Sequence, residues 1–219
     1  MTKPIICFTF DDGHLNVYEN AFPLFKKFGY EATTFLNSGR IGKSGFVSWD
    51  QAHDLYSNNW EIGGHTINHP QLPELNYDEA YYQIVQDYHN FQEQGFHLTS
   101  FALPSGHASP RDYDILKEVY KNIRNSIDKE MHLPLNRLDL GYFAYQTEYS
   151  PQIVKQRIIR GSINGEALIV IGFHRVSDTE INAVDNCNIR DLEEILSWVA
   201  EKDYHIMRLD DAVDELLNK

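Results

Sequence analysis

Short apolar runs alternate with amphipathic segments along most of this 219-residue chain, and this alternation restricts the fold more than any other feature. Each run has the length and apolar character of a buried strand, and most are followed by a segment with helical periodicity. The strand-like runs are Ile5–Phe10, Ala32–Asn37, Trp60–Gly64, Thr99–Leu103, Ile123–Ile127, Ala167–Phe173 and Tyr204–Leu209. About seven such units predict an α/β chain whose parallel strands form a distorted (β/α) barrel, a single domain over residues 1–219. A doubly wound open sheet is the alternative.

Start signals support the helices between these runs. Ser48 and Asn76 each begin a capping-box pattern, and Ser109 and Ser150 each precede a proline at the first helical position. A helix over residues 189–202 has its apolar face formed by Leu192, Ile195, Leu196 and Val199. Residues 131–147 are expected to form an irregular loop with one extra strand at most.

The charge balance excludes several classes of partner. The chain carries 19 Lys and Arg against 32 Asp and Glu, a net charge of −13, which disfavours binding to nucleic acids or anionic membranes. No apolar run approaches the roughly 18 residues that cross a bilayer. The first apolar run is too short for an export signal, so we expect a cytoplasmic protein; a longer native chain with such a signal would act outside the cell.

Two carboxylates follow the first strand-like run. Asp11 and Asp12 precede Gly13, a residue that permits a sharp turn. A plain Asp-Gly turn is one interpretation. Adjacent carboxylates repel one another unless a cation or a proton relieves them, so the pair also suggests a metal site at the carboxyl end of a strand.

Two histidines follow the third run. His65 and His69 are four residues apart, and we expect them on one helical turn that Pro70 stops from extending. With one carboxylate from the first strand they would form a two-His-one-carboxylate set, which leaves positions open for water.

Two further groups stand at the ends of other runs. His174 ends the very apolar sixth run, where partial desolvation suits a proton donor, although a structural histidine is the simpler interpretation of a single residue. The loop Pro104-Ser105-Gly106 ends the fourth run and can direct backbone N–H groups into the same mouth.

These motifs, in this order, resemble those of the polysaccharide deacetylases, also called carbohydrate esterase family 4. Residues 9–13 match the first motif of the family and residues 65–69 match its His-Thr-x-x-His motif. The Pro104 loop is similar to the third motif, and Phe173-His174 is similar to the last. The resemblance spans residues 5 to about 210 and implies a distorted barrel that removes acetyl groups from N-acetylated sugars with the help of a metal.

The resemblance also implies a role for each residue. Asp12, His65 and His69 would bind one divalent transition metal, zinc in the first place and cobalt as an alternative. Asp11 would be the general base and His174 the general acid. Pro104, Ser105 and Gly106 would contact the substrate, with the backbone N–H of Ser105 facing the oxyanion.

Two departures from the family pattern stand out. Ala102 occupies the position of an arginine that orients the aspartate base, and Arg124 and Arg175 are both candidates to replace that arginine. Asp128 is the nearest candidate for the aspartate that tunes the acid histidine in the fourth motif.

Three functions follow as alternatives. The first is an N-deacetylase for an N-acetylated amino sugar in an oligosaccharide, glycan intermediate or polysaccharide. The second is an O-acetyl esterase or a small cyclic-amide amidohydrolase on the same metal site, and the third is a sugar-binding module without catalysis. Aromatic residues before the last motif could stack on a sugar, but packing is the simpler interpretation of Tyr142, Phe143 and Tyr145.

Overall fold

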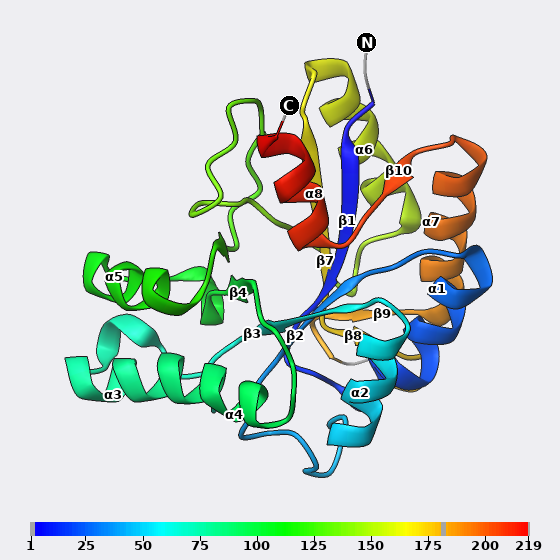
Figure 1. Cartoon of the computed structure of the whole chain (residues 1–219). Coiled ribbons are helices and arrows are strands. Elements are labelled where there is room, and N and C mark those ends of the chain that lie inside the picture. The colour runs from blue at the N-terminus through cyan, green and yellow to red at the C-terminus, as the bar shows by residue number, and fades with distance from the viewer. Residues whose placement is uncertain (1–2, 181–182, 219) are drawn as a thin grey trace.

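Strand β1 (Ile5–Phe10) lies at the centre of a curled parallel sheet in the computed structural model, which describes residues 3–180 and 183–218 (Figure 1). β7 pairs with β1 along its whole length, whereas β2 and β10 pair with its carboxyl-terminal and amino-terminal parts, respectively. The sheet follows the order β5-β4-β3-β2-β1-β7-β6. The remaining strands of this sheet are β2 (Thr33–Leu36), β3 (Glu61–Gly64), β4 (Ser100–Ala102), β5 (Asn122–Arg124), β6 (Phe143–Ala144), β7 (Leu168–Phe173) and β10 (His205–Ile206). The predicted single domain with a distorted (β/α) barrel is confirmed, and the open doubly wound sheet is wrong.

Two predicted strands end earlier than their apolar runs. β5 stops at Arg124, and Ile127, the last residue of the predicted strand, is 59% exposed. The last run contributes only the two residues of β10, because Leu209 begins a helix and its N–H donates a hydrogen bond to the Thr33 hydroxyl. Apolar character predicted burial correctly at Leu209 but not the backbone conformation.

Helices cover the outer face of the sheet (Figure 1). They are α1 (Phe22–Phe28), α2 (Trp49–Ser57), α3 (Tyr77–Tyr81), α4 (Asp87–Glu93), α5 (Pro110–Val119), α6 (Pro151–Asn164) and α7 (Ile189–Glu201). The last helix, α8 (Leu209–Leu217), packs instead against the inner face. Capping boxes form at Ser48, Asn76 and Ser109, whereas the Ser150 side chain caps nothing. All four predicted apolar-face residues of α7 are buried. Within the described residues, no helix is both long enough and apolar enough to cross a bilayer.

The inside of the curled sheet has its own apolar cluster. Cys7, Phe35 and Val170 point inward from β1, β2 and β7, while Phe8 and its neighbours on the other face pack beneath the helices. Ala212 and Val213 of α8 join the inner cluster, and Figure 1 shows α8 beside the end of the sheet where β1 begins. One mouth of the barrel is therefore filled, and the carboxyl ends of the strands are left for a site.

The segment between β5 and β6 closes the gap between the two edges of the sheet. The N–H of Leu140 donates to the carbonyl of Ile123, and the N–H of Asn125 donates to the carbonyl of Leu140. β6 then pairs in parallel with β7, so the predicted irregular region does contain one short strand. A second small sheet, β8 (Arg175–Val176) with β9 (Asn186–Cys187), follows β7.

Glu61, the first residue of β3, is a buried carboxylate whose ionisation should affect the stability of the fold. Its carboxylate is buried, accepts from the Thr33 hydroxyl and the Asp210 N–H, and burial together with the charge of Asp210 raises its pKa from 4.5 to about 8. The unfolded chain releases this proton near pH 4.5 while the folded chain keeps it, so the free energy of unfolding should fall as pH rises from about 4.5 to about 8.

Glu61→Gln should remove this part of the pH dependence, because glutamine stays neutral and still offers an oxygen to Thr33. Urea denaturation at pH 5 and pH 8 checks the prediction: the wild type should lose more stability over this interval than Glu61→Gln. Glu74→Gln, at an exposed position, is the control and should behave as the wild type. Equal losses in the wild type and Glu61→Gln would contradict the assignment.

Candidate active site and metal centre

A pocket of about 330 Å³ opens at the carboxyl ends of the strands. It is lined by groups from the segments that follow β1, β3 and β7, and by residues after β4 and at the end of β5. The five predicted reactive side chains all line it: Asp11, Asp12, His65, His69 and His174. Residues more than 160 positions apart in the chain thus meet at one mouth, as the strand-end rule predicts.

Three of these side chains converge on one point. Oδ1 of Asp12 lies 3.9 Å from Nε2 of His65 and 3.8 Å from Nε2 of His69. One oxygen and two imidazole nitrogens lie within 4.8 Å of one another. Two imidazoles and one carboxylate form a donor set that zinc and similar transition metals accept.

The loop between the two histidines is not the helical turn expected from their spacing. Thr66 and His69 both have left-handed backbone conformations, with φ of +66° and +60°, and the N–H of His69 donates to the Thr66 hydroxyl. The Asn37 amide donates to the carbonyls of His65 and Thr66 at 2.5 and 3.0 Å. Bonds from a neighbouring strand end, rather than helical periodicity, bring the two rings together.

The orientation of His65 is set from two sides. Its Nδ1 lies 2.7 Å from the carbonyl oxygen of Ala102, which assigns the proton to Nδ1 and leaves the Nε2 lone pair toward Asp12. Its backbone N–H donates to the buried carboxylate of Asp87 in α4, which also accepts from the N–H of Ser38. Burial lowers the pKa of His65 to about 4, so the ring is neutral near pH 7, as a ligand must be. Burial also raises the pKa of Asp87 to about 7.

Asp12 adopts a left-handed conformation with φ of +72°, which turns its carboxylate toward the histidines. Burial opposes its ionisation, but the hydrogen bond from the His14 side chain and the positive charges that His65 and His69 carry when protonated at low pH outweigh burial, so the pKa of Asp12 lies well below its usual range. Arg40 also donates to Oδ1 of Asp12 at 2.7 Å. A metal ion would therefore share this carboxylate with a guanidinium, a neighbour that the sequence did not predict.

Asp11 pairs with a buried arginine. Nη2 of Arg124 donates to Oδ2 of Asp11 at 2.6 Å, and both side chains are almost fully buried. Oδ1 of Asp11 has no hydrogen-bond partner among the described residues. The guanidinium lies between the rings of Phe35 and Tyr142, at 5.0 and 4.1 Å from their centroids. One carboxylate oxygen is held and the other stays available.

The structure distinguishes between the two arginine candidates. Arg124 contacts Asp11, whereas Arg175 pairs with Asp185 and Glu180. Ala102 and Arg124 are register partners on β4 and β5. The guanidinium that the family pattern places at position 102 is thus supplied by Arg124 on the adjacent strand.

His174 lies between two carboxylates. Its Nε2 is 3.9 Å from Oδ2 of Asp11, and its Nδ1 is 4.0 Å from Oδ2 of Asp185. Asp128 is wrong as the carboxylate beside this histidine, because Arg157 and Arg160 bind it at 2.6 and 3.0 Å. Asp185 precedes β9, and sequence reasoning missed it because only pairing of β8 with β9 brings it back toward β7.

The loop after β4 contributes two of its three predicted residues to the pocket lining. Ser105 and Gly106 line the pocket in left-handed conformations, and the Ser105 hydroxyl accepts from the Gln71 amide. A Cβ at Gly106 would lie 1.8 Å from the Ser126 hydroxyl, so only glycine fits there. Pro104 is buried beside them.

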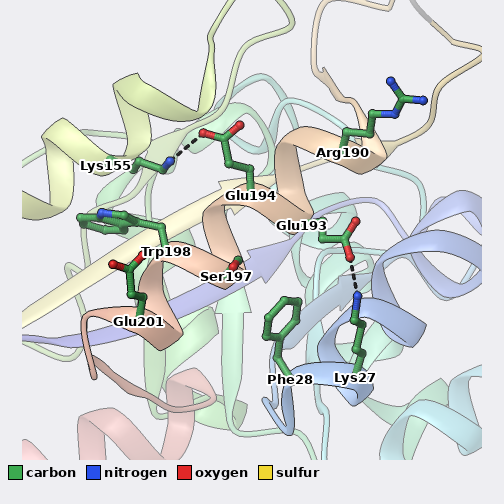
Figure 2. Close-up of a pocket in the computed structure, with 9 residues that line it drawn as sticks. All are labelled: Lys27, Phe28, Lys155, Arg190, Glu193, Glu194, Ser197, Trp198 and Glu201. Atoms are coloured by element: carbon green, nitrogen blue, oxygen red, sulfur yellow. Dashed lines mark hydrogen bonds and ion pairs between the residues drawn. The ribbon is translucent and has the colours of Figure 1, made fainter.

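A second hollow lies on the outer surface between α1, α6 and α7 (Figure 2). Lys27 pairs with Glu193 and Lys155 pairs with Glu194, each at 2.6 Å. Figure 2 shows Phe28 beside Lys27 and Trp198 below Lys155. The charged groups of this hollow largely neutralise one another, and none of the five side chains predicted to be reactive lines it.

Comparison with known proteins shows the family of this chain. Residues 1–121, more than half of the chain, match the family model of the polysaccharide deacetylases. A 71-residue segment is 34% identical to the putative polysaccharide deacetylase YxkH of Bacillus subtilis, covering 32% of this chain and 25% of that protein. An 80-residue segment is 31% identical to a poly-β-1,6-N-acetyl-D-glucosamine N-deacetylase of Staphylococcus aureus, covering 34% and 28%. The matched segments thus span about a quarter of each of these relatives.

A solved structure extends the likeness to the whole fold. BA3943 of Bacillus anthracis, a pseudoenzyme of carbohydrate esterase family 4, superposes with a TM-score of 0.66 at 18% identity, covering 98% of this chain and 66% of that one. At this identity the likeness concerns the fold alone. The match to the family model includes Asp12, His65 and His69. It shows that this chain belongs to the polysaccharide deacetylase family.

Proposed function

We propose that this chain is a metal-dependent hydrolase that removes N-acetyl groups from an amino sugar in an oligosaccharide, glycan intermediate or polysaccharide. The observation that carries the proposal is the convergence of Asp12, His65 and His69 beside Asp11 and His174 in one pocket. The relative from Staphylococcus aureus, named for N-deacetylation of an N-acetylglucosamine polymer, supports the substrate class.

The residues present fit a divalent transition metal. Asp12, His65 and His69 would hold it, and the buried, neutral imidazole of His65 is already oriented by the Ala102 carbonyl. When bound, such an ion supplies Lewis-acid chemistry, polarising the scissile carbonyl and making water more acidic. Zinc is the first candidate for this set of nitrogen and oxygen donors, and cobalt is the second.

Asp11 and His174 would then move the protons. Arg124 holds Oδ2 of Asp11, so the unpartnered Oδ1 is the oxygen that accepts a proton from the attacking water. His174 would give a proton to the nitrogen that leaves as an amine, because an unprotonated amide nitrogen is a poor leaving group. The backbone N–H of Ser105 is our candidate donor to the oxyanion, since this residue lines the pocket.

Acetate release from N-acetylglucosamine oligomers tests the proposal. Protein freed of metal with a chelator and reloaded with zinc or cobalt should release acetate, and the chelated protein should not. Acetyl esters and cyclic imides belong in the same panel, because the same residues could attack those carbonyls. Release from esters alone would assign an esterase, and sugar binding without acetate release under either metal would assign an inactive binding module.

The metal site has a readout of its own. His65→Ala and His69→Ala should each lose most of the one zinc or cobalt ion per chain that we expect in the wild type, measured by equilibrium dialysis with elemental analysis. His205→Ala, an exposed histidine on β10, is the control and should retain the ion. Full occupancy in both site variants would place the ion elsewhere.

A further inference from the structure

Tyr142 precedes the last motif and lines the pocket. Phe143 and Tyr145 pack instead, the former against Tyr149 and the latter against Phe173. Packing was thus the right interpretation for these two residues. Tyr142 has a different environment, and its hydroxyl has no role in the proposed reaction.

The ring of Tyr142 is held on both faces. The Arg124 guanidinium lies 4.1 Å from its centroid, and a Cβ added to Gly172 of β7 would lie 1.5 Å from a ring carbon. The backbone N–H of Tyr142 donates to the Ile127 carbonyl. A ring fixed in this way holds its hydroxyl at one position, and both Tyr142 and Asp11 line the pocket.

The hydroxyl of Tyr142 has no hydrogen-bond partner in the part of the chain that the structure describes. Its oxygen is buried and makes no hydrogen bond among the described residues, whereas the Tyr145 hydroxyl donates to the Tyr149 carbonyl at 2.6 Å. An unsatisfied buried hydroxyl is destabilising, and such groups in native proteins call for a functional explanation. The ring alone would fill the space beside Gly172, so packing does not explain the oxygen.

The hydroxyl is suited to donate rather than to accept a proton. Burial and the charge of Asp11 raise the pKa of Tyr142 well above its usual value, against the opposing effect of Arg124. The O–H group therefore stays protonated at neutral pH. Its natural partner is an oxygen acceptor that enters the pocket from outside.

We propose that the Tyr142 hydroxyl donates a hydrogen bond to an oxygen of the acylated sugar bound in this pocket. The inference rests on the proposed function for the identity of that sugar. A pocket of about 330 Å³ is within the usual range for small-ligand sites, and an acylated sugar offers both a carbonyl and several hydroxyl oxygens. Tyr142 would then be a substrate-contacting residue beside the reacting groups.

Tyr142→Phe tests this, because it removes the oxygen and keeps the ring. We expect kcat/KM for N-acetylglucosamine oligomers to fall roughly 5- to 100-fold, the range for losing the partner of a buried polar group. A fall in kcat would assign the contact to the carbonyl in the transition state, and a rise in KM would assign it to a sugar hydroxyl. The thermal midpoint should not fall, since the hydroxyl makes no hydrogen bond to residues 3–180 or 183–218.

Tyr120→Phe is the matched control. The Tyr120 hydroxyl is also buried and unpartnered, but it packs against Gly64 and does not line the pocket. This variant should keep kcat/KM within about twofold of the wild type. An unchanged kcat/KM in Tyr142→Phe, or an equal loss in both variants, would overturn the inference.

Binding measurements test the contact with Tyr142 separately from the proposed deacetylase activity. If the wild type releases no acetate, the proposed function fails, and calorimetric titration with the same oligomers decides about Tyr142 by itself. Weaker binding to Tyr142→Phe than to the wild type and Tyr120→Phe would support the contact. Equal binding, or no binding to any of the three proteins, would overturn it.

Discussion

Asp11→Asn is expected to lower the turnover of acetylated sugar by roughly 10²–10⁴-fold. Because it leaves the buried Arg124 guanidinium without an opposite charge, it should also lower the free energy of unfolding, so folding of the variant is checked by urea denaturation. Asparagine keeps the size of the side chain and an oxygen for Arg124, but it cannot accept the proton that Oδ1 is positioned to receive. The effect should appear in kcat under saturating zinc or cobalt. Acetate release measured with N-acetylglucosamine oligomers gives the comparison.

Asp114→Asn is the matched control for this prediction. Asp114 is an exposed carboxylate of α5 that pairs with Lys117 at the surface, and its loss should leave turnover unchanged. His174→Ala should reduce turnover over a similar range if this residue protonates the leaving amine. Unaltered turnover in both Asp11→Asn and His174→Ala would refute the assigned proton transfers.

Arg124→Met is expected to lower the free energy of unfolding by about 3–5 kcal/mol, the usual consequence of leaving a buried charge without its partner. Methionine keeps an apolar contact between Phe35 and Tyr142 but removes the donor to Asp11. Turnover should fall as well, because Asp11 loses the bond that orients it. Urea denaturation and acetate release measure the two effects.

Two further variants separate this pair from ordinary ion pairs. The double variant Asp11→Asn/Arg124→Met should be more stable than Arg124→Met alone, since asparagine leaves no buried charge behind. Lys117→Met breaks the exposed pair with Asp114 and should cost about 1 kcal/mol or less. If Arg124→Met were no more destabilising than Lys117→Met, the buried pair would not have the importance given to it here.

The arginine partner of Asp11 illustrates where sequence reasoning stopped. Ala102 at the position of the expected arginine left Arg124 and Arg175 as candidates, and nothing in the linear order favoured one of them. The answer depends on register: Arg124 lies opposite Ala102 in the sheet and reaches Asp11, which is 113 residues away in the chain. Pairing of β4 with β5 cannot be read from local composition.

Local patterns were reliable where the physics is local. The strand-like runs, the capping boxes at Ser48 and Asn76 and the buried face of α7 all follow from hydrogen bonds or apolar spacing within a few residues. The same reasoning failed for residues 65–69, because spacing alone suggested a helical turn. The left-handed Thr66 and the bonds from Asn37 come from tertiary context.

The order of residues was sufficient to predict a curled parallel sheet and to place Asp11, Asp12, His65, His69 and His174 at strand ends, because strand and helix periodicity and the strand-end rule need no knowledge of distant contacts. Only the tertiary structure determined what surrounds them. The pairing of Asp11 with Arg124, the approach of Asp185 to His174 and the enclosed hydroxyl of Tyr142 each depend on strand register and on burial across the barrel. These features join residues that no local pattern relates, and burial strengthens the interaction between Asp11 and Arg124 in particular.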